Sequence, residues 1–140
     1  MSSNQAPRAF AAKLRWNALA GICLVVAPFV SLPIFANFGE SLGVTPWIIF
    51  MTAASAALAL SLYLLFDAML FNLMASYEDD AEGGLAVDDF LARTGLRKMP
   101  SANRPLAERM AGSERLLTFQ RAALLVFVAF FAFMTVRGSA

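Results

Sequence analysis

Asp67 is the residue whose type and position most suggest chemistry, because it is the single charge inside an apolar run from Pro46 to Ser76. An ionised carboxylate within lipid is costly, so such groups usually pair with another charge or line an ion pathway. Arg121 borders the last apolar run of the chain, and Tyr63 lies one helical turn before Asp67. We therefore predict an interhelical ion pair between Asp67 and Arg121, with Tyr63 donating a hydrogen bond to the carboxylate.

The predicted pair requires that Asp67 and Arg121 lie at the same depth in the membrane. Asp67 lies about 30 Å along a helix from Trp47, and Arg121 lies about 24 Å from Arg137. Both side chains are therefore expected near the same edge of the hydrocarbon core. Two alternatives stay open: each side chain extends separately to the interface, or Asp67 is a proton or cation site in a transport path.

Other kinds of chemistry lack the residues they need. The chain has no histidine, which excludes His-based nucleophilic catalysis and His-ligated zinc or haem. Cys23 is the only cysteine and lies in an apolar run, so we interpret it as a packing residue. The acidic cluster at 78–82 lacks the spacing of a calcium loop and is interpreted as a solvated linker. We predict no catalytic residue, no metal site, no cofactor and no enzymatic activity.

Three apolar segments must position these residues. The chain is 59% hydrophobic and 15% charged, with a mean hydropathy of +0.64, whereas soluble domains average about 45–50% and 25%. About 20 apolar residues cross the hydrocarbon core as a helix, whose backbone satisfies its own polar groups. We predict an all-α fold, a three-pass transmembrane helical bundle forming one integral membrane domain over residues 1–140. The spans are expected at about 15–36, 46–76 and 116–137.

Small residues on the first two spans predict where helices approach each other closely. The stripes are Cys23, Ala27 and Ser31 on the first span, Ala53, Ala57 and Ser61 on the second, and Ser55, Ala59, Tyr63 and Asp67 on the second span's other side. The two stripes of the second span face nearly opposite ways at helical spacing. We therefore predict that this span is the middle of the bundle, although either face could meet a partner protein or another copy.

The segment 77–115 is the only sizeable polar stretch, and it is expected to hold one or two short amphipathic helices. In the first, Val87, Phe90 and Leu91 share a face, and Gly95 suits the end. This helix is expected on the membrane surface or docked on the bundle. The second runs from Leu106 to Arg121, with a possible bend at 112–113.

The positive charges predict the orientation. Ten of the 11 Lys and Arg residues lie before the first span, in or beside the 77–115 segment, or at Arg121, which leaves Arg137 alone at the other side. Since Lys and Arg accumulate in cytoplasmic loops, we predict a cytoplasmic amino terminus and an outside carboxyl terminus. The Ala- and Arg-rich composition suggests a bacterial inner membrane.

These observations predict a small non-catalytic membrane protein, an accessory or adaptor subunit of a larger membrane complex. The alternative is an oligomeric transporter or channel component in which Asp67 is a polar intramembrane site. The expected partners are the lipid bilayer and other membrane subunits or further copies of this chain. A net charge of +1 and the lack of a base-reading module argue against nucleic acid.

Overall fold

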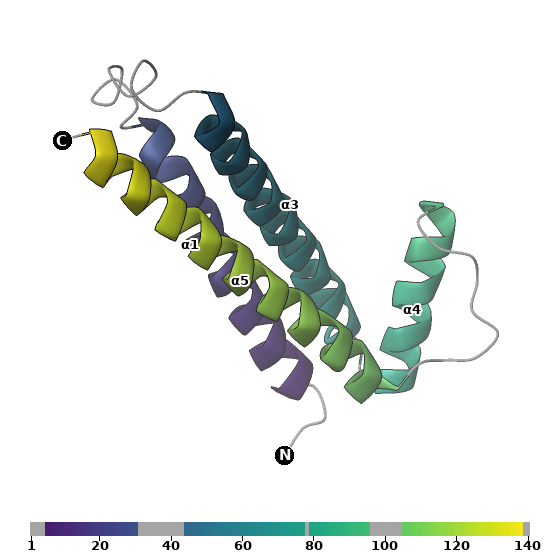
Figure 1. Ribbon diagram of the computed structural model, residues 1–140. Coiled ribbons are helices and arrows are strands. Elements are labelled where there is room, and N and C mark those ends of the chain that lie inside the picture. The colour runs from purple at the N-terminus through teal and green to yellow at the C-terminus, as the bar shows by residue number, and fades with distance from the viewer. Residues whose placement is uncertain (1–4, 31–43, 78, 96–104, 139–140) are drawn as a thin grey trace.

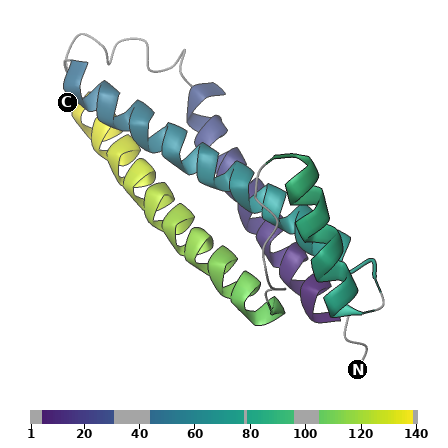
Figure 2. The same ribbon diagram turned by 90° about the vertical axis from the view of Figure 1, so that its right-hand side faces the viewer.

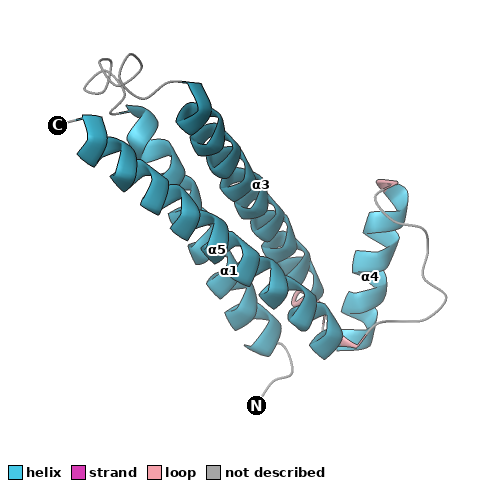
Figure 3. Cartoon of the chain, viewed as in Figure 1, coloured by secondary structure: helices cyan, strands magenta, loops and turns pink. Residues whose placement is uncertain are grey.

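The computed structural model describes residues 5–30, 44–77, 79–95 and 105–138. The described chain forms four helices, which are α1 (Gln5–Val30), α3 (Val44–Met74), α4 (Asp80–Arg93) and α5 (Leu106–Gly138) (Figure 3). Helices α1, α3 and α5 are long and apolar enough to cross a membrane, and they run side by side in Figure 1. The all-α prediction is confirmed, and three helices of this kind indicate a membrane protein.

Two helices extend beyond their predicted spans. Helix α1 begins at Gln5 and includes the basic segment that precedes the first apolar run. Pro7 is tolerated there because the first turn of a helix has no internal partner for its N–H groups. Helix α5 continues through Gly112 and Ser113 without a break, so the predicted amphipathic helix and third span are one element.

Helix α3 contacts each of the other three helices, as expected for the middle of the bundle. It uses one side to do so, and its buried residues recur every three or four positions: Phe50, Ala54, Ala57, Ser61, Leu64, Ala68, Phe71 and Met74. Ala57 and Ser61 of the predicted stripe are fully buried and Ala53 is half-buried. Ser55, Ala59 and Tyr63 of the predicted second stripe are exposed, so this face does not pack within the described chain, and the predicted alternative of a partner protein or another copy stays a prediction.

The predicted packing face of α1 is also wrong. Cys23 and Ala27 are exposed, and Ser31 lies outside the described residues. The buried side of α1 instead carries Phe10, Ala11, Leu14, Ala18, Gly21 and Val25. Gly21 leaves room on this side for the side chains of the other two long helices, because a Cβ there would lie 2.4 Å from Gln120 Nε2 and 2.6 Å from Ser61 Oγ. Small size alone did not identify the face, since an exposed small residue in lipid costs little.

The core of the bundle has two apolar clusters. One surrounds Leu14 and Leu64 near the end that holds the amino terminus. The other is aromatic, with Phe50 stacked on Phe127 at 5.0 Å between ring centroids and 25° between planes. Many large apolar side chains face outward, including Leu62, Met69, Phe119 and Leu125, each more than half exposed. Such a surface is unfavourable in water and suits a lipid surround.

Helix α4 folds back obliquely along the bundle from the end of α3 (Figures 1 and 2). Asp79 caps its amino terminus by accepting from Ala81 N at 3.2 Å. Gly95, at φ +71°, follows its last turn, as predicted. The acidic cluster is therefore no linker in its described part, because it supplies the cap and first turn of this helix.

Candidate functional site

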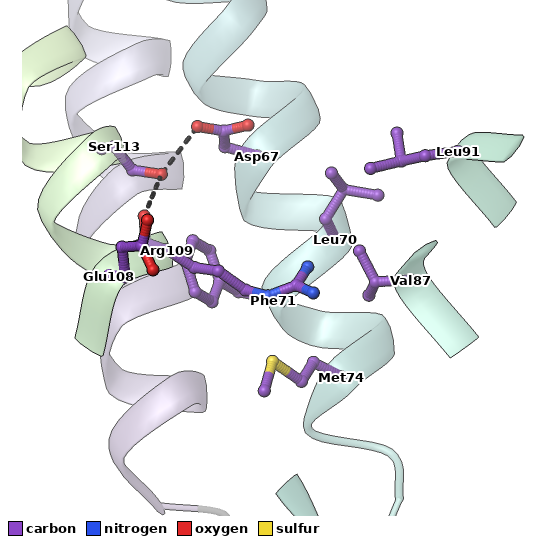
Figure 4. Close-up of a pocket in the computed structure, with 10 residues that line it drawn as sticks. Asp67, Leu70, Phe71, Met74, Val87, Leu91, Glu108, Arg109 and Ser113 are labelled. Carbon is purple, nitrogen blue, oxygen red and sulfur yellow. Dashed lines mark hydrogen bonds between the residues drawn. The ribbon is translucent and has the colours of Figure 1, made fainter. Parts of the chain in front are cut away.

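The candidate site is a cavity of about 220 Å³ where α3, α4 and α5 converge (Figure 4). Its walls combine aliphatic and aromatic carbon with a few polar groups. They are formed by Asp67, Leu70, Phe71 and Met74 of α3, Val87 and Leu91 of α4, and Glu108, Arg109, Gly112 and Ser113 of α5. An apolar cavity with a few converging polar groups is the usual form of a small-ligand or docking site.

Asp67 is held from α5 by a serine. Ser113 Oγ donates to Asp67 Oδ2 at 2.7 Å, and the same hydroxyl lies 3.4 Å from the Arg109 carbonyl. A hydrogen bond to a charged group is shorter and stronger than a neutral one, so the carboxylate is the main acceptor. The second Asp67 oxygen points away from Ser113, toward the side of α4 (Figure 4). This oxygen is available to a group that enters the cavity.

The predicted ion pair is not formed. Arg121 Nη2 lies 3.4 Å from Asn17 Oδ1, and no salt bridge in the described part of the chain joins Asp67 to Arg121. Tyr63 does not bond to Asp67 either, because its side chain is 64% exposed on the outer side of α3. Ser113 takes the position that had been assigned to Arg121.

The level of Asp67 relative to the residues of α5 was predicted wrongly for a specific reason. Trp47 packs on the same aromatic cluster as Phe131 and Met134, so Arg137 extends beyond the level of Trp47. The residue of α5 level with Asp67 therefore comes earlier in the chain than the count from Arg137 gave. Ser113 precedes Arg121 by about 12 Å of helix. Tertiary packing, rather than the distance to the nearest end charge, decided the register.

A buried ion pair fixes α4 beside the cavity. Arg109 Nη2 donates to Asp88 Oδ2 at 2.7 Å, and these side chains are only 12% and 7% exposed. Arg109 also lies 3.5 Å from the Gly84 carbonyl. Asp88 Oδ1 is buried and has no hydrogen-bond partner among the described residues. The pair ties the middle of α4 to the first turns of α5.

Helix α4 also approaches the end of α3 very closely. A Cβ at Gly83 would lie 2.5 Å from the Met74 carbonyl oxygen. Gly83 and Gly84 are both buried at this contact. Glycine is needed here for close helix approach rather than for flexibility.

Sequence reasoning missed a second polar cluster, which lies between the two apolar clusters. Gln120 Nε2 donates to Ser61 Oγ at 2.8 Å and to the Asn17 carbonyl at 3.2 Å, which joins all three long helices. Ser61 Oγ in turn donates to the Ala57 carbonyl at 2.8 Å. Gln120 could have indicated this cluster from the sequence, because it is an uncharged amide at the start of an apolar run. Buried amides in membranes usually form hydrogen bonds across helices.

The chemistry open to the cavity is that of two carboxylates, Asp67 and Glu108, in a largely apolar setting. In residues 5–30, 44–77, 79–95 and 105–138, no group of three or more His, Cys, Asp or Glu side chains is placed to hold a metal ion. Asp67 can accept a hydrogen bond or neutralise a cationic group. Arg109 faces the cavity with its charge already balanced by Asp88. Comparison with protein families, curated proteins and solved structures finds no match for this chain.

Proposed function

We propose that this chain is a small non-catalytic membrane adaptor that presents α4 to a partner subunit in a larger membrane complex. The observation that carries the proposal is the buried Asp88–Arg109 pair, which fixes α4 against the bundle. The proposed location is a bacterial inner membrane, with the amino terminus and α4 on the cytoplasmic side.

The energetics of that pair favour a positioning role. Two buried charges lose their hydration, and their attraction often no more than offsets this loss. A well-packed apolar pair would hold α4 at least as strongly. The ion pair adds specificity of position. A hydrogen-bonded geometry allows one register of α4 against the bundle, whereas apolar contact allows several. A defined register matters when a helix presents a surface to another protein.

The outer side of α4 supplies such a surface. Leu85 is 60% and Phe90 is 42% exposed, whereas Val87 and Asp88 between them are buried against the bundle. At helical spacing Leu85 and Phe90 point about 140° apart, so they are two apolar contact points that flank the outer side of α4. Ser55 and Ala59 on the outer side of α3 support a further helix contact within the membrane.

The second candidate is an oligomeric transporter component, favoured by the cavity-facing oxygen of Asp67. Within one chain the described core does not continue this polar site across the bundle. Beyond Asp67, the next buried polar groups are Ser61 and Gln120. The stacked rings of Phe50 and Phe127 lie beyond these two residues. A transport path would therefore have to run between copies.

The adaptor proposal is tested by photo-crosslinking in cells. A photoreactive amino acid at Leu85 or Phe90 is expected to give one discrete protein adduct, and the matched control at Phe119, exposed on α5, is expected to give none. Adducts with lipid alone at Leu85 and Phe90 would contradict the proposal. Conductance in reconstituted vesicles that disappears in Asp67→Asn would favour the transporter instead.

The proposed orientation has its own test. In a Cys23→Ser background, Arg93→Cys on α4 and Arg137→Cys at the end of α5 each give a single exposed thiol. A membrane-impermeant maleimide added to spheroplasts is expected to label the second and spare the first until the membrane is opened. The reverse labelling pattern would overturn the orientation.

A further inference from the structure

A second groove lies between α1 and α3, on the end of the bundle where α3 terminates. It has a volume of about 430 Å³. Its two cations come from α1, and its polar wall comes from α3. The lining residues are Arg8, Ala11, Ala12, Arg15, Trp16 and Asn72. The groove shares no residue with the Asp67 cavity.

The groove is a site of uncompensated positive charge. Arg8 and Arg15 lie two helical turns apart on α1, about 10 Å along the axis. Arg8 Nη2 donates to the Ala75 carbonyl at 3.3 Å, which holds its guanidinium over the end of α3. Arg15 makes no ion pair or hydrogen bond with any residue that the structure describes, and no carboxylate lines the groove. Lys13, by contrast, faces α5 and pairs with Glu114 at 3.4 Å.

An apolar surface continues from the groove toward the middle of the bundle. On α1 the same side carries Leu19 and Val26, which are both exposed. On α3, Met69 and Leu62 follow Asn72 at helical spacing and are more than half exposed. Trp16 stands at the junction and is 75% exposed, as is typical of an indole at the boundary between headgroups and acyl chains.

We propose that this groove binds one anionic phospholipid, with its phosphate between Arg8 and Arg15 and its acyl chains along the adjoining apolar surface. Basic pockets between membrane helices recognise such headgroups by charge. The guanidinium fork matches phosphate geometry, and Asn72 supplies a further donor to the headgroup. The apolar continuation distinguishes a lipid from free phosphate, which would use the two cations and nothing beyond them.

The test uses the full chain purified in mild detergent and examined by native mass spectrometry. Phosphatidylglycerol and phosphatidylcholine with identical acyl chains are titrated in parallel, with inorganic phosphate as a competitor. Wild type is expected to retain one phosphatidylglycerol in preference to phosphatidylcholine. Arg15→Gln is expected to weaken that binding about fivefold, since each Lys or Arg near an anionic lipid surface contributes ~1 kcal/mol.

Two further variants make the test specific. Arg115→Gln removes an exposed cation on α5, outside the groove, and is expected to leave the preference unchanged. Ala12→Phe fills the groove without altering charge and is expected to abolish binding, and Ala12 is exposed, so the bundle can form around it. The proposal is overturned if wild type shows no preference, if Arg115→Gln acts like Arg15→Gln, if Ala12→Phe binds normally, or if inorganic phosphate displaces the lipid.

Discussion

Gln120 of α5 and Ser61 of α3 form a hydrogen bond of 2.8 Å at the centre of the bundle, where both side chains are fully buried. The same amide reaches the Asn17 carbonyl of α1, so one side chain sets the relative register of three helices. In lipid, apolar surfaces do not select one register strongly, whereas a hydrogen-bonded pair does. Gly21 leaves the space in which this contact forms.

Gly21→Ala is expected to destabilise the bundle, because the new Cβ would lie 2.4 Å from Gln120 Nε2 and 2.6 Å from Ser61 Oγ. We expect the free energy of unfolding to fall by about 1–3 kcal/mol, the usual cost of overpacking. Unfolding in sodium dodecyl sulfate, followed by tryptophan fluorescence, measures it. The Gly21→Ala/Gln120→Ala double variant should recover part of the loss, and an additive loss would contradict this account.

The Asp88–Arg109 pair is expected to behave as a buried ion pair. Asp88→Leu or Arg109→Leu alone leaves an uncompensated charge and should reduce the free energy of α4 docking by about 3–5 kcal/mol. The double Leu variant should lose much less, because it removes both charges together. Hydrogen exchange of α4 amides in detergent reports docking. Exchange of α4 amides as slow as in the wild type in all three variants would show that the pair does not hold the helix.

Gly83→Ala is expected to detach α4 from the end of α3. The added Cβ would meet the Met74 carbonyl oxygen at 2.5 Å, and a helix backbone cannot move aside cheaply. We expect faster hydrogen exchange across α4 with the bundle intact. Gly112→Ala is the matched control, since its Cβ meets nothing within 4 Å, and it should stabilise α5 by up to about 1 kcal/mol. A protected α4 in Gly83→Ala would refute the close contact.

The partner of Asp67 can be identified by comparing two single variants. Ser113→Ala removes the 2.7 Å donor to the carboxylate, and we expect a loss of about 1.5–3 kcal/mol in unfolding free energy. Arg121→Gln changes an exposed side chain with one long contact, and its effect should stay within about 0.5 kcal/mol. The same detergent unfolding assay measures both. A larger effect at Arg121 would restore the ion pair predicted from sequence.

Much of the helix content followed from the sequence because it depends on local properties. Long apolar runs can satisfy their backbone in lipid only as helices, so three such helices were predictable without tertiary information. The end of α4 at Gly95 was equally local, because a left-handed residue there favours glycine. The burial of Ala57 and Ser61 on α3 also followed from their small size. The middle position of α3, by contrast, depends on one buried side and not on the two opposite stripes from which it was predicted.

The site was not predictable in this way, because it depends on which residues of separate helices come level with each other. The apolar stripes of α1 and α3 are compatible with several rotations and axial offsets, and lipid does not penalise an exposed Cys23 or Ala27. The Gln120–Ser61 hydrogen bond and the packing around Phe50 and Phe127 together set the offset that places Ser113 beside Asp67. The sequence by itself determined that the chain forms membrane-length helices, and the tertiary structure decided their register and therefore every polar contact between them.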